Sequence, residues 1–533
     1  MARRIYILCM MLAAVLQLQA QALQEYTRAV TDKDCYLTGE QMLVKVNVTD
    51  ESGKPLTFSK VAYVELCDGQ GIQAQCMVQL TDGEGWAAMD LPNSMHSGNY
   101  LMSVYTRYMR NFSPEHYARK VLPVVNLMHT SETDRVEWME GENPVRTGVL
   151  GGLQADRASY GIRSRVQLAL PAEAATMRSL TLSVSRRDLS PVPVEMPRLA
   201  AAQPEGQNHF PEMEGHVVTA RQLNAHGGKS VLAAVGQNAI LFEGQQQPDG
   251  TTRYYTSGLT GNLPVVINRF GSEDAQAAME TVSPYQGVVP EDLPVLKMYY
   301  DRNGLNDRSV GMQVQHAVQA SLPHEPMPFN VQLKSNEPAR LYDLDEWTRF
   351  KTVREIILEF VTGINRRKVG DRNQLFISYV NGIQNWPAMV LLDGAPISDV
   401  DELLQYDARR LKYLAVYDGR YTFGENIWNG VISFMSHRAS LSDIYLPEDS
   451  QMFTYAFPQD RPAYYMPVYD TEEMRQSSAP DFRHTLYWNP CVNPNTDSCT
   501  FYTSDLTGTF RAVLTGLDAQ GHEHRWDAMF EVE

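Results

Sequence analysis

The sequence QMLVKVNVTDESGKPLTFSKVAYVELCD, which spans residues 41–68, decides the class of fold. Val44, Val46 and Val48 alternate with other residues, as the buried face of a β-strand requires. A Ser-Gly-Lys-Pro turn follows, and residues 61–66 then offer apolar side chains on both faces, which is typical of a central strand. We therefore expect antiparallel β-structure in this part of the chain.

The same pattern of short strands and turns extends outward from this stretch. About seven strands fit into some 100 residues, which indicates a β-sandwich. We expect a mainly β, multi-domain protein of immunoglobulin-like sandwiches with one small α+β domain. The predicted segments are a first sandwich (23–126), a second sandwich segment (127–195), a third β-rich domain (196–270), an irregular connector (271–344), the α+β domain (345–440), an irregular loop (441–480) and a C-terminal sandwich segment (481–533).

The α+β domain contains the best-defined helix of the chain. Thr352 and Glu355 form a Thr-x-x-Glu capping box at its start, and Gly363 is placed to end it. Its apolar residues recur at helical spacing, at Val353, Ile356, Ile357 and Phe360. Buried strands are expected at 388–392, 413–417 and 431–434, with a short helix near 400–405.

Residues 1–22 have the pattern of a cleaved secretory signal peptide. Arg3 and Arg4 precede an apolar run of about 12 residues, which is shorter than the roughly 20 that a membrane-spanning helix needs. We therefore expect an exported protein, periplasmic or associated peripherally with the outer membrane, with no membrane-spanning segment in the mature chain.

The formal net charge of −17 bears on the choice of partners. Nucleic acid and anionic lipid surfaces repel such a chain, so neither is expected as a partner, whereas an envelope protein is.

Cys35, Cys67, Cys76, Cys491 and Cys499 follow the predicted signal peptide. An oxidising compartment permits disulfides, and Cys491 with Cys499 could close a short loop. Cys67 could pair with Cys76 in the same way. Buried free thiols are an equally supported alternative.

The first sandwich resembles the second macroglobulin-type domain of alpha-2-macroglobulins. The resemblance rests on the order and spacing of TDKDCYLTGE (31–40), DESGKPL (50–56), TDGEG (81–85) and SGNY (97–100). The stretch YTRYMRNF at 105–112 is closest to the version found in exported Bacteroidetes proteins. The resemblance implies macroglobulin-like sandwiches in an exported protein.

The α+β domain resembles the plug domain of TonB-dependent outer-membrane transporters. The shared motifs are VLLDGAPI (390–397), LKYLAVY (411–417), YTFG (421–424) and NGVI (429–432). Lys412 and Tyr413 depart from the Ile-Glu of the transporter pattern, and Glu425–Trp428 replaces a glycine-rich run. Fewer than 100 residues follow Phe434, so we expect this plug-like domain to work without a barrel.

The C-terminal motifs PDFRHTLYWNP (480–490) and FYTSDLTGTFR (501–511) resemble the closing sandwich segment of the same Bacteroidetes proteins.

No motif in the sequence nominates a catalytic residue, a cofactor or a metal site. The Cys-Gly-Glu-Gln that forms the thioester of protease-trapping macroglobulins is replaced by Thr38-Gly39-Glu40-Gln41, so covalent capture is excluded there. His522 and His524 could share a metal ion, but without a third ligand they fit a solvated strand better.

Tyr464, Tyr465 and Tyr469 lie among prolines and form the best candidate for a recognition loop. We expect a non-enzymatic binding or scaffolding protein of the envelope, and an accessory role in outer-membrane nutrient uptake is one hypothesis of this kind. The alternatives are a macroglobulin-like protease inhibitor without a thioester and a surface adhesin or pilus-like component. An enzyme is a less favoured class.

Overall fold

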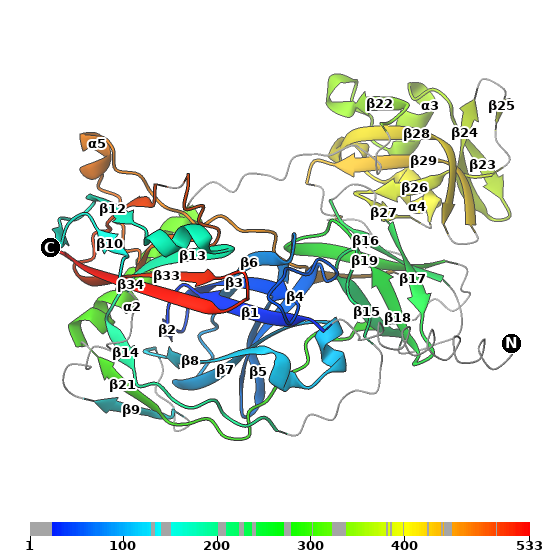
Figure 1. Cartoon of the computed structure of the whole chain (residues 1–533). Helices are drawn as coiled ribbons and strands as arrows, with labels where there is room; N and C mark the ends of the chain where they lie inside the picture. The colour runs from blue at the N-terminus through cyan, green and yellow to red at the C-terminus, as the bar shows by residue number, and fades with distance from the viewer. Residues whose placement is uncertain are drawn as a thin grey trace, which may run out of the picture. The chain divides into compact units, whose positions relative to one another are not determined.

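The computed structural model describes most of the chain (Figure 1). The described residues are 24–128, 134–139, 151–200, 209–222, 229–236, 241–270, 279–300, 302–321, 337–379, 382–383, 386–397, 399–423, 426–438, 441, 450–496 and 498–533. The predicted signal peptide, 1–22, lies outside them. Among the described helices, none is both long and apolar enough to cross a membrane.

The chain forms two compact units, each built from separated stretches of sequence. Unit 1 contains Met1–Met213, Tyr285–Leu322 and Gln459–Glu533, and unit 2 contains Glu214–Pro284 and Pro323–Pro458. The structure is mainly β with several sheets, so the predicted fold class is confirmed.

The first sandwich of unit 1 contains the valines that alternate in the sequence. Val44, Val46 and Val48 are fully buried in a core shared by its two sheets. One sheet has the order β1-β3-β6: β1 (Tyr26–Thr31), β3 (Gln41–Thr49) and β6 (Glu84–Asp90). The other has the order β2-β8-β7-β4-β5: β2 (Tyr36–Leu37), β8 (Ala118–Val125), β7 (Gly98–Thr106), β4 (Val61–Asp68) and β5 (Gly71–Gln79).

A second sandwich in unit 1 joins residues that are more than 300 positions apart. Its larger sheet has the order β11-β34-β33-β13-β31: β11 (Ser159–Tyr160), β34 (Glu523–Val532), β33 (Gly508–Leu517), β13 (Ser179–Arg186) and β31 (Thr485–Asn489). Its smaller sheet comprises β10 (Gln154–Ala155), β12 (Arg165–Ala169) and β32 (Thr500–Tyr502). The second and C-terminal segments of the sequence are therefore two parts of one sandwich.

The predicted irregular connector, 271–344, is wrong for much of its length. It contains β20 (Met279–Thr281), β21 (Leu296–Tyr300), the 20-residue helix α2 (Arg302–Ser321) and β22 (Arg340–Asp343). In unit 1, β21 lies between β14 (Leu189–Pro191) and β9 (Val136–Met139). The sequence of α2 contains two glycines and many polar residues, so it lacks the apolar stripe that predicts a helix.

Unit 2 contains a seven-stranded sheet of order β20-β15-β18-β17-β16-β19-β30. Its further strands are β15 (Val217–Gln222), β18 (Thr251–Tyr255), β17 (Leu241–Gln246), β16 (Lys229–Ala234), β19 (Asn262–Phe270) and β30 (Ser450–Ala456). The predicted irregular loop, 441–480, is therefore wrong at β30 and at the short helix α5 (Glu472–Arg475). The strand β30 is ordered by seven pairings with β19, which local sequence does not reveal.

The α+β domain of unit 2 packs two helices against a sheet of order β22-β28-β29-β26-β27. The capping box of Thr352 and Glu355 is confirmed at the start of its first helix. The elements are α3 (Val353–Glu359), α4 (Val400–Gln405), β26 (Met389–Leu392), β27 (Ala395–Pro396), β28 (Leu411–Phe423) and β29 (Asn426–Ser436), beside a separate small sheet of β23 (Ile364–Val369), β24 (Arg372–Tyr379) and β25 (Gly382–Ile383). The expected order of helices and strands is thus present.

Candidate functional site

Residues 459–474, which we call the tyrosine segment, begin by closing an edge of the first sandwich. The backbone of Gln459 exchanges hydrogen bonds with β5, with Met77 at 2.9 Å and Gln79 at 2.8 Å. Its side-chain amide donates to and accepts from the backbone of Ala88 in β6, at 2.7 and 2.9 Å. One glutamine therefore satisfies strand groups of both sheets, which fixes where the segment starts.

Two tyrosine hydroxyls hold the middle of the segment. The Tyr464 hydroxyl donates to the Thr485 carbonyl at 2.6 Å, and the Tyr469 hydroxyl donates to the Asp481 carboxylate at 3.0 Å. Burial raises the pKa of both phenols above their ordinary value, so both hydroxyls stay protonated donors.

Arg163 holds the end of the segment and the turn that follows α5. Its guanidinium forms a two-pronged ion pair with Asp505, at 2.6 and 2.7 Å, and lies over the Tyr469 ring. The same group donates to three backbone carbonyls, at Arg475, Ser477 and Ala479. The planar fork of arginine suits this many partners, so the segment is fixed at both ends.

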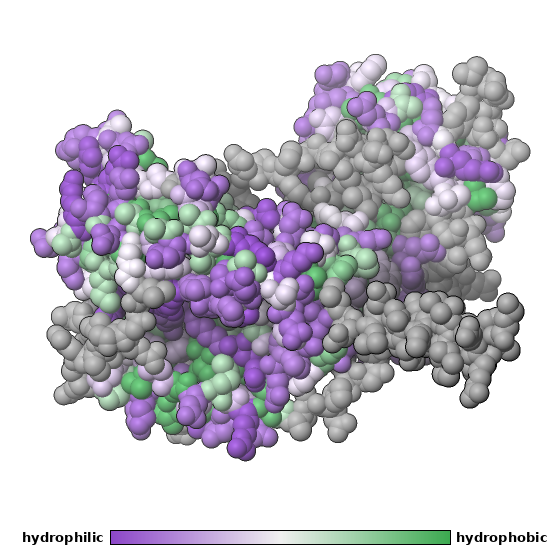
Figure 2. Space-filling model, viewed as in Figure 1, coloured by the Kyte–Doolittle hydropathy of each residue, from purple (hydrophilic) through white to green (hydrophobic). Residues whose placement is uncertain are grey.

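Between these anchors the segment leaves apolar side chains in solvent. Tyr465 is 57% exposed and Val468 52%, while Met466 and Met474 are 37% and 47% exposed. The face drawn in Figure 2 is largely hydrophilic with smaller hydrophobic patches. Of the three predicted recognition tyrosines, the structure places Tyr465 at the surface and uses Tyr464 and Tyr469 as anchors. Gln459 and Arg163 carry no local signal that sequence analysis could have used.

A buried ionic cluster lies elsewhere in unit 1, around Arg308 of α2. Arg308 donates to both carboxylate oxygens of Glu40, at 2.6 and 2.7 Å, to Asp188 at 2.8 Å and to the Cys35 carbonyl at 2.9 Å. His484 lies 3.1 Å from the second oxygen of Asp188. The cluster ties α2 to both sandwiches.

The charges of this cluster compensate one another. Burial by itself would raise the pKa of Glu40 and Asp188. The Arg308 guanidinium, together with Lys33 at Glu40 and His484 at Asp188, outweighs burial and holds both pKa values well below their usual range. Burial, with Arg308 next in effect, lowers the pKa of His484. Nδ1 of His484 is buried without a hydrogen-bond partner among the described residues, but the charged groups of the cluster contact one another, so we interpret the cluster as structural.

The two histidines considered as metal ligands, His522 and His524, contact a neighbouring carboxylate instead. Nε2 of His524 and Nδ1 of His522 lie 3.1 and 3.3 Å from one Asp518 carboxylate oxygen. Across the described ranges, no group of three or more His, Cys, Asp or Glu is placed to hold a metal ion. Gly39, with φ of 83°, forms the turn that precedes β3.

Among the described residues, Cys491 and Cys499 form no disulfide, and neither do Cys35, Cys67 and Cys76. Cys499 is buried in the core of the second sandwich, and Cys491 lies 3.6 Å from the Lys45 ammonium. The disulfide between Cys491 and Cys499 is thus not formed here, and it stays a prediction.

No protein-family description matches the chain, and no curated protein does. Among solved structures, native alpha-2-macroglobulin from E. coli is similar at 10% identity, covering 96% of this chain and 40% of its own, with a TM-score of 0.24. A Salmonella alpha-2-macroglobulin mutant is similar at 10% identity, covering 95% of this chain and 39% of its own, with a TM-score of 0.22. Dimeric latent PorU from Porphyromonas gingivalis is similar at 8% identity, covering 95% of this chain and 34% of its own, with a TM-score of 0.16. The chain spans about two fifths or less of these proteins, and the likeness assigns it to no family.

Proposed function

We propose that this protein is a non-enzymatic binding or scaffolding protein of a bacterial envelope, and that the tyrosine segment contacts its partner protein. One observation carries the proposal: buried hydrogen bonds fix the segment, while Tyr465, Met466, Val468 and Met474 stay exposed on it.

A fixed segment is suited to recognition for a thermodynamic reason. A binding loop that is ordered before it meets its partner loses less conformational entropy on association. Tyrosine and methionine are enriched in protein interfaces, because they bury a large area with adaptable packing. The anchors therefore make the exposed residues a better binding surface than a free loop of the same composition.

Export and the envelope location rest on the predicted signal peptide, 1–22. The motif resemblances to macroglobulin-type and plug domains support a role beside other envelope proteins. Within this proposal, a component of an outer-membrane nutrient-uptake system is the partner that the plug-like motifs favour.

A photo-crosslinking amino acid at position 465 tests the contact in intact cells. We expect a specific cross-linked product at position 465. The matched control is position 255, because Tyr255 is also an exposed tyrosine, at 40%, and belongs to unit 2. Equal cross-linking at both positions, or none at 465, would contradict the proposal.

The same experiment is repeated with Val468→Asp to check that the contact is apolar. We expect the product to be lost, whereas Met529→Asp, at an exposed methionine of β34, should leave it unchanged. A protease trapped as the partner would favour the inhibitor alternative, and a ladder of self-cross-linked chains would favour the adhesin or pilus alternative.

A further inference from the structure

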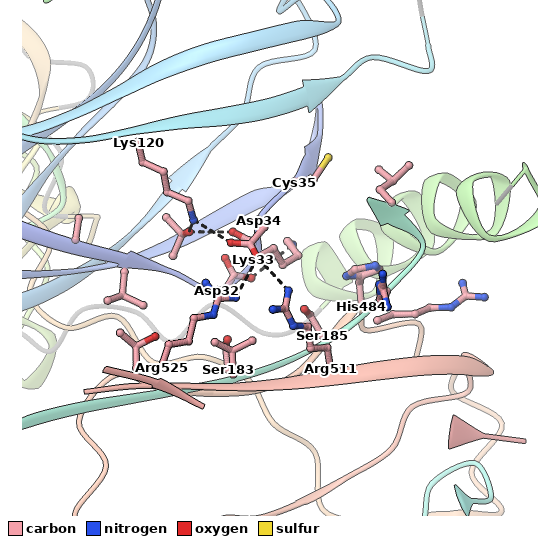
Figure 3. A pocket seen from close by; sticks show the side chains of 18 of the residues that line it. Asp32, Lys33, Asp34, Cys35, Lys120, Ser183, Ser185, His484, Arg511 and Arg525 are labelled. Atoms are coloured by element: carbon pink, nitrogen blue, oxygen red, sulfur yellow. Dashed lines mark hydrogen bonds and ion pairs between the residues drawn. The ribbon is translucent and has the colours of Figure 1, made fainter. Parts of the chain in front are cut away.

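A pocket of about 260 Å³ lies between the two sandwiches of unit 1, apart from the tyrosine segment. We call it the basic pocket, and its side chains of interest are Asp34, Lys120, Ser183, Ser185, Arg511 and Arg525 (Figure 3). The loop after β1 and strand β8 supply one side, and β13, β33 and β34 supply the other. Both sandwiches therefore contribute to it.

The lining of this pocket is opposite in charge to the chain as a whole. It comprises eight arginine or lysine residues and four aspartate or glutamate residues. After the carboxylates of Glu40 and Asp527, which pair with lining cations, are also counted, two positive charges remain in excess, whereas the whole chain has a formal charge of −17. A concave site with excess positive charge concentrates anions from solution.

The Asp34 carboxylate shows how the pocket binds an oxyanion. Lys120 contacts one of its oxygens at 3.0 Å, and Arg525 and Arg511 contact the other at 3.2 and 3.3 Å. Lys120 above all holds the pKa of Asp34 well below its usual range. Three cations thus surround one internal carboxylate, with Asp527 as a further partner of both arginines.

Donors remain after Asp34 and Asp527 are satisfied. Nη1 of Arg525 makes no hydrogen bond to any described residue, and Lys120 uses two of its three N–H groups, on Asp34 and Thr31. The hydroxyls of Ser183 and Ser185 likewise have no described partner.

The sheet geometry gathers these groups on one surface. In β13, Leu182 and Val184 face the core of the second sandwich, so Ser183 and Ser185 face away from it. Ser185 is paired in register with Arg511, and Thr515 with Arg525. The side chains of Arg511 and Arg525 are 29% and 38% exposed, so a ligand can reach both guanidinium groups from solvent.

We propose that the basic pocket binds the phosphate group of a small soluble molecule. A phosphate has more acceptor oxygens than a carboxylate, and charge-assisted bonds from lysine, arginine and serine suit it. The pocket volume of about 260 Å³ is several times the roughly 30 Å³ that one water molecule takes in the liquid. The pocket therefore has room for an organic phosphate and not only for a single small ion. The acidic chain is repelled by anionic lipid surfaces, which favours a soluble phosphate over a lipid headgroup.

Isothermal titration of the full-length protein with inorganic phosphate and with glucose 6-phosphate, at constant ionic strength, tests the proposal. We expect saturable binding that weakens at least about tenfold in Arg525→Gln, because one charge-assisted donor is lost. Arg409→Gln is the matched control, since Arg409 is an exposed arginine of unit 2 paired with Asp407. Equally weak phosphate binding in all variants would overturn the proposal. A parallel titration in which acetate binds as strongly as phosphate would overturn it as well.

Asp34→Asn separates a binding role from a structural one. Removing the internal carboxylate frees the contact that each of the three cations makes with it, although both arginines keep their pair with Asp527. Phosphate affinity should therefore rise in this variant even if its stability falls. Unchanged or reduced affinity in a folded Asp34→Asn protein would refute an oxyanion site. If Arg525→Gln does not fold, Lys120→Gln replaces it with the same expectation.

Co-sedimentation with phosphatidylcholine vesicles that contain phosphatidic acid distinguishes the source of the phosphate. We expect no co-sedimentation while glucose 6-phosphate binds. Co-sedimentation that Arg525→Gln abolishes would overturn the soluble ligand and assign the same pocket to a lipid phosphate.

Discussion

Replacing Arg308 by methionine would remove the buried guanidinium that Glu40 and Asp188 share. Both carboxylates would stay in the interior, between α2 and the two sandwiches, without their main cationic partner. Breaking a buried ion pair in this way costs about 3 to 5 kcal/mol, because an uncompensated charge is left behind. We expect the free energy of unfolding of unit 1 to fall by about that amount at pH 7.

The stability that Arg308 provides to unit 1 should depend on pH, because it acts on the ionised forms of Glu40 and Asp188. In the native protein, the folded pKa values of Glu40 and Asp188 lie below the unfolded values near 4. Their pairing therefore contributes full stability above about pH 4, and the contribution is lost as the pH falls through the folded pKa values. In Arg308→Met, burial is left as the main influence and raises both pKa values, so the stability deficit should shrink as the pH falls from 7 towards 5.

Urea unfolding followed by tryptophan fluorescence measures the deficit, and hydrogen exchange of peptides from β3 and β13 assigns it to unit 1. Arg409→Met serves as the control, because its exposed pair with Asp407 should contribute nothing measurable. A deficit below about 1 kcal/mol, or one of equal size at pH 7 and pH 5, would refute the interpretation of the cluster.

Three further changes test other parts of the structure. Tyr469→Phe should lower the stability of unit 1 by about 1 to 2 kcal/mol in urea unfolding, since it leaves the Asp481 carboxylate without one buried donor. Thr352→Ala should cost unit 2 about 1 kcal/mol by removing the N-cap of α3, and Thr352→Ser should restore most of it. Gly430→Ala should lower the melting temperature of unit 2, because a Cβ there meets the Ile377 side chain and the residue has φ of 93°; an unchanged melting temperature would contradict this packing.

Local patterns determined the elements that depend on near neighbours. The alternating valines of 41–68 predicted a buried strand, because a strand in one sheet of a sandwich points every second side chain into the core between the sheets. The capping box at Thr352 predicted where α3 begins, because its hydrogen bonds join residues only three positions apart. The prolines around Tyr464, Tyr465 and Tyr469 predicted an exposed loop for all three, but only Tyr465 is exposed, and its role in recognition stays a prediction.

Only the tertiary structure decided how distant segments combine. Nothing local indicates that β13 pairs with β31 and β33, or that β30 completes the sheet of unit 2. Arg308 and Lys120 look like ordinary surface cations in the sequence, yet the fold buries one among carboxylates and places the other in the basic pocket. The physical reason is that burial, charge pairing and strand neighbours depend on contacts between residues far apart in the chain, which the periodicity of any single stretch does not specify.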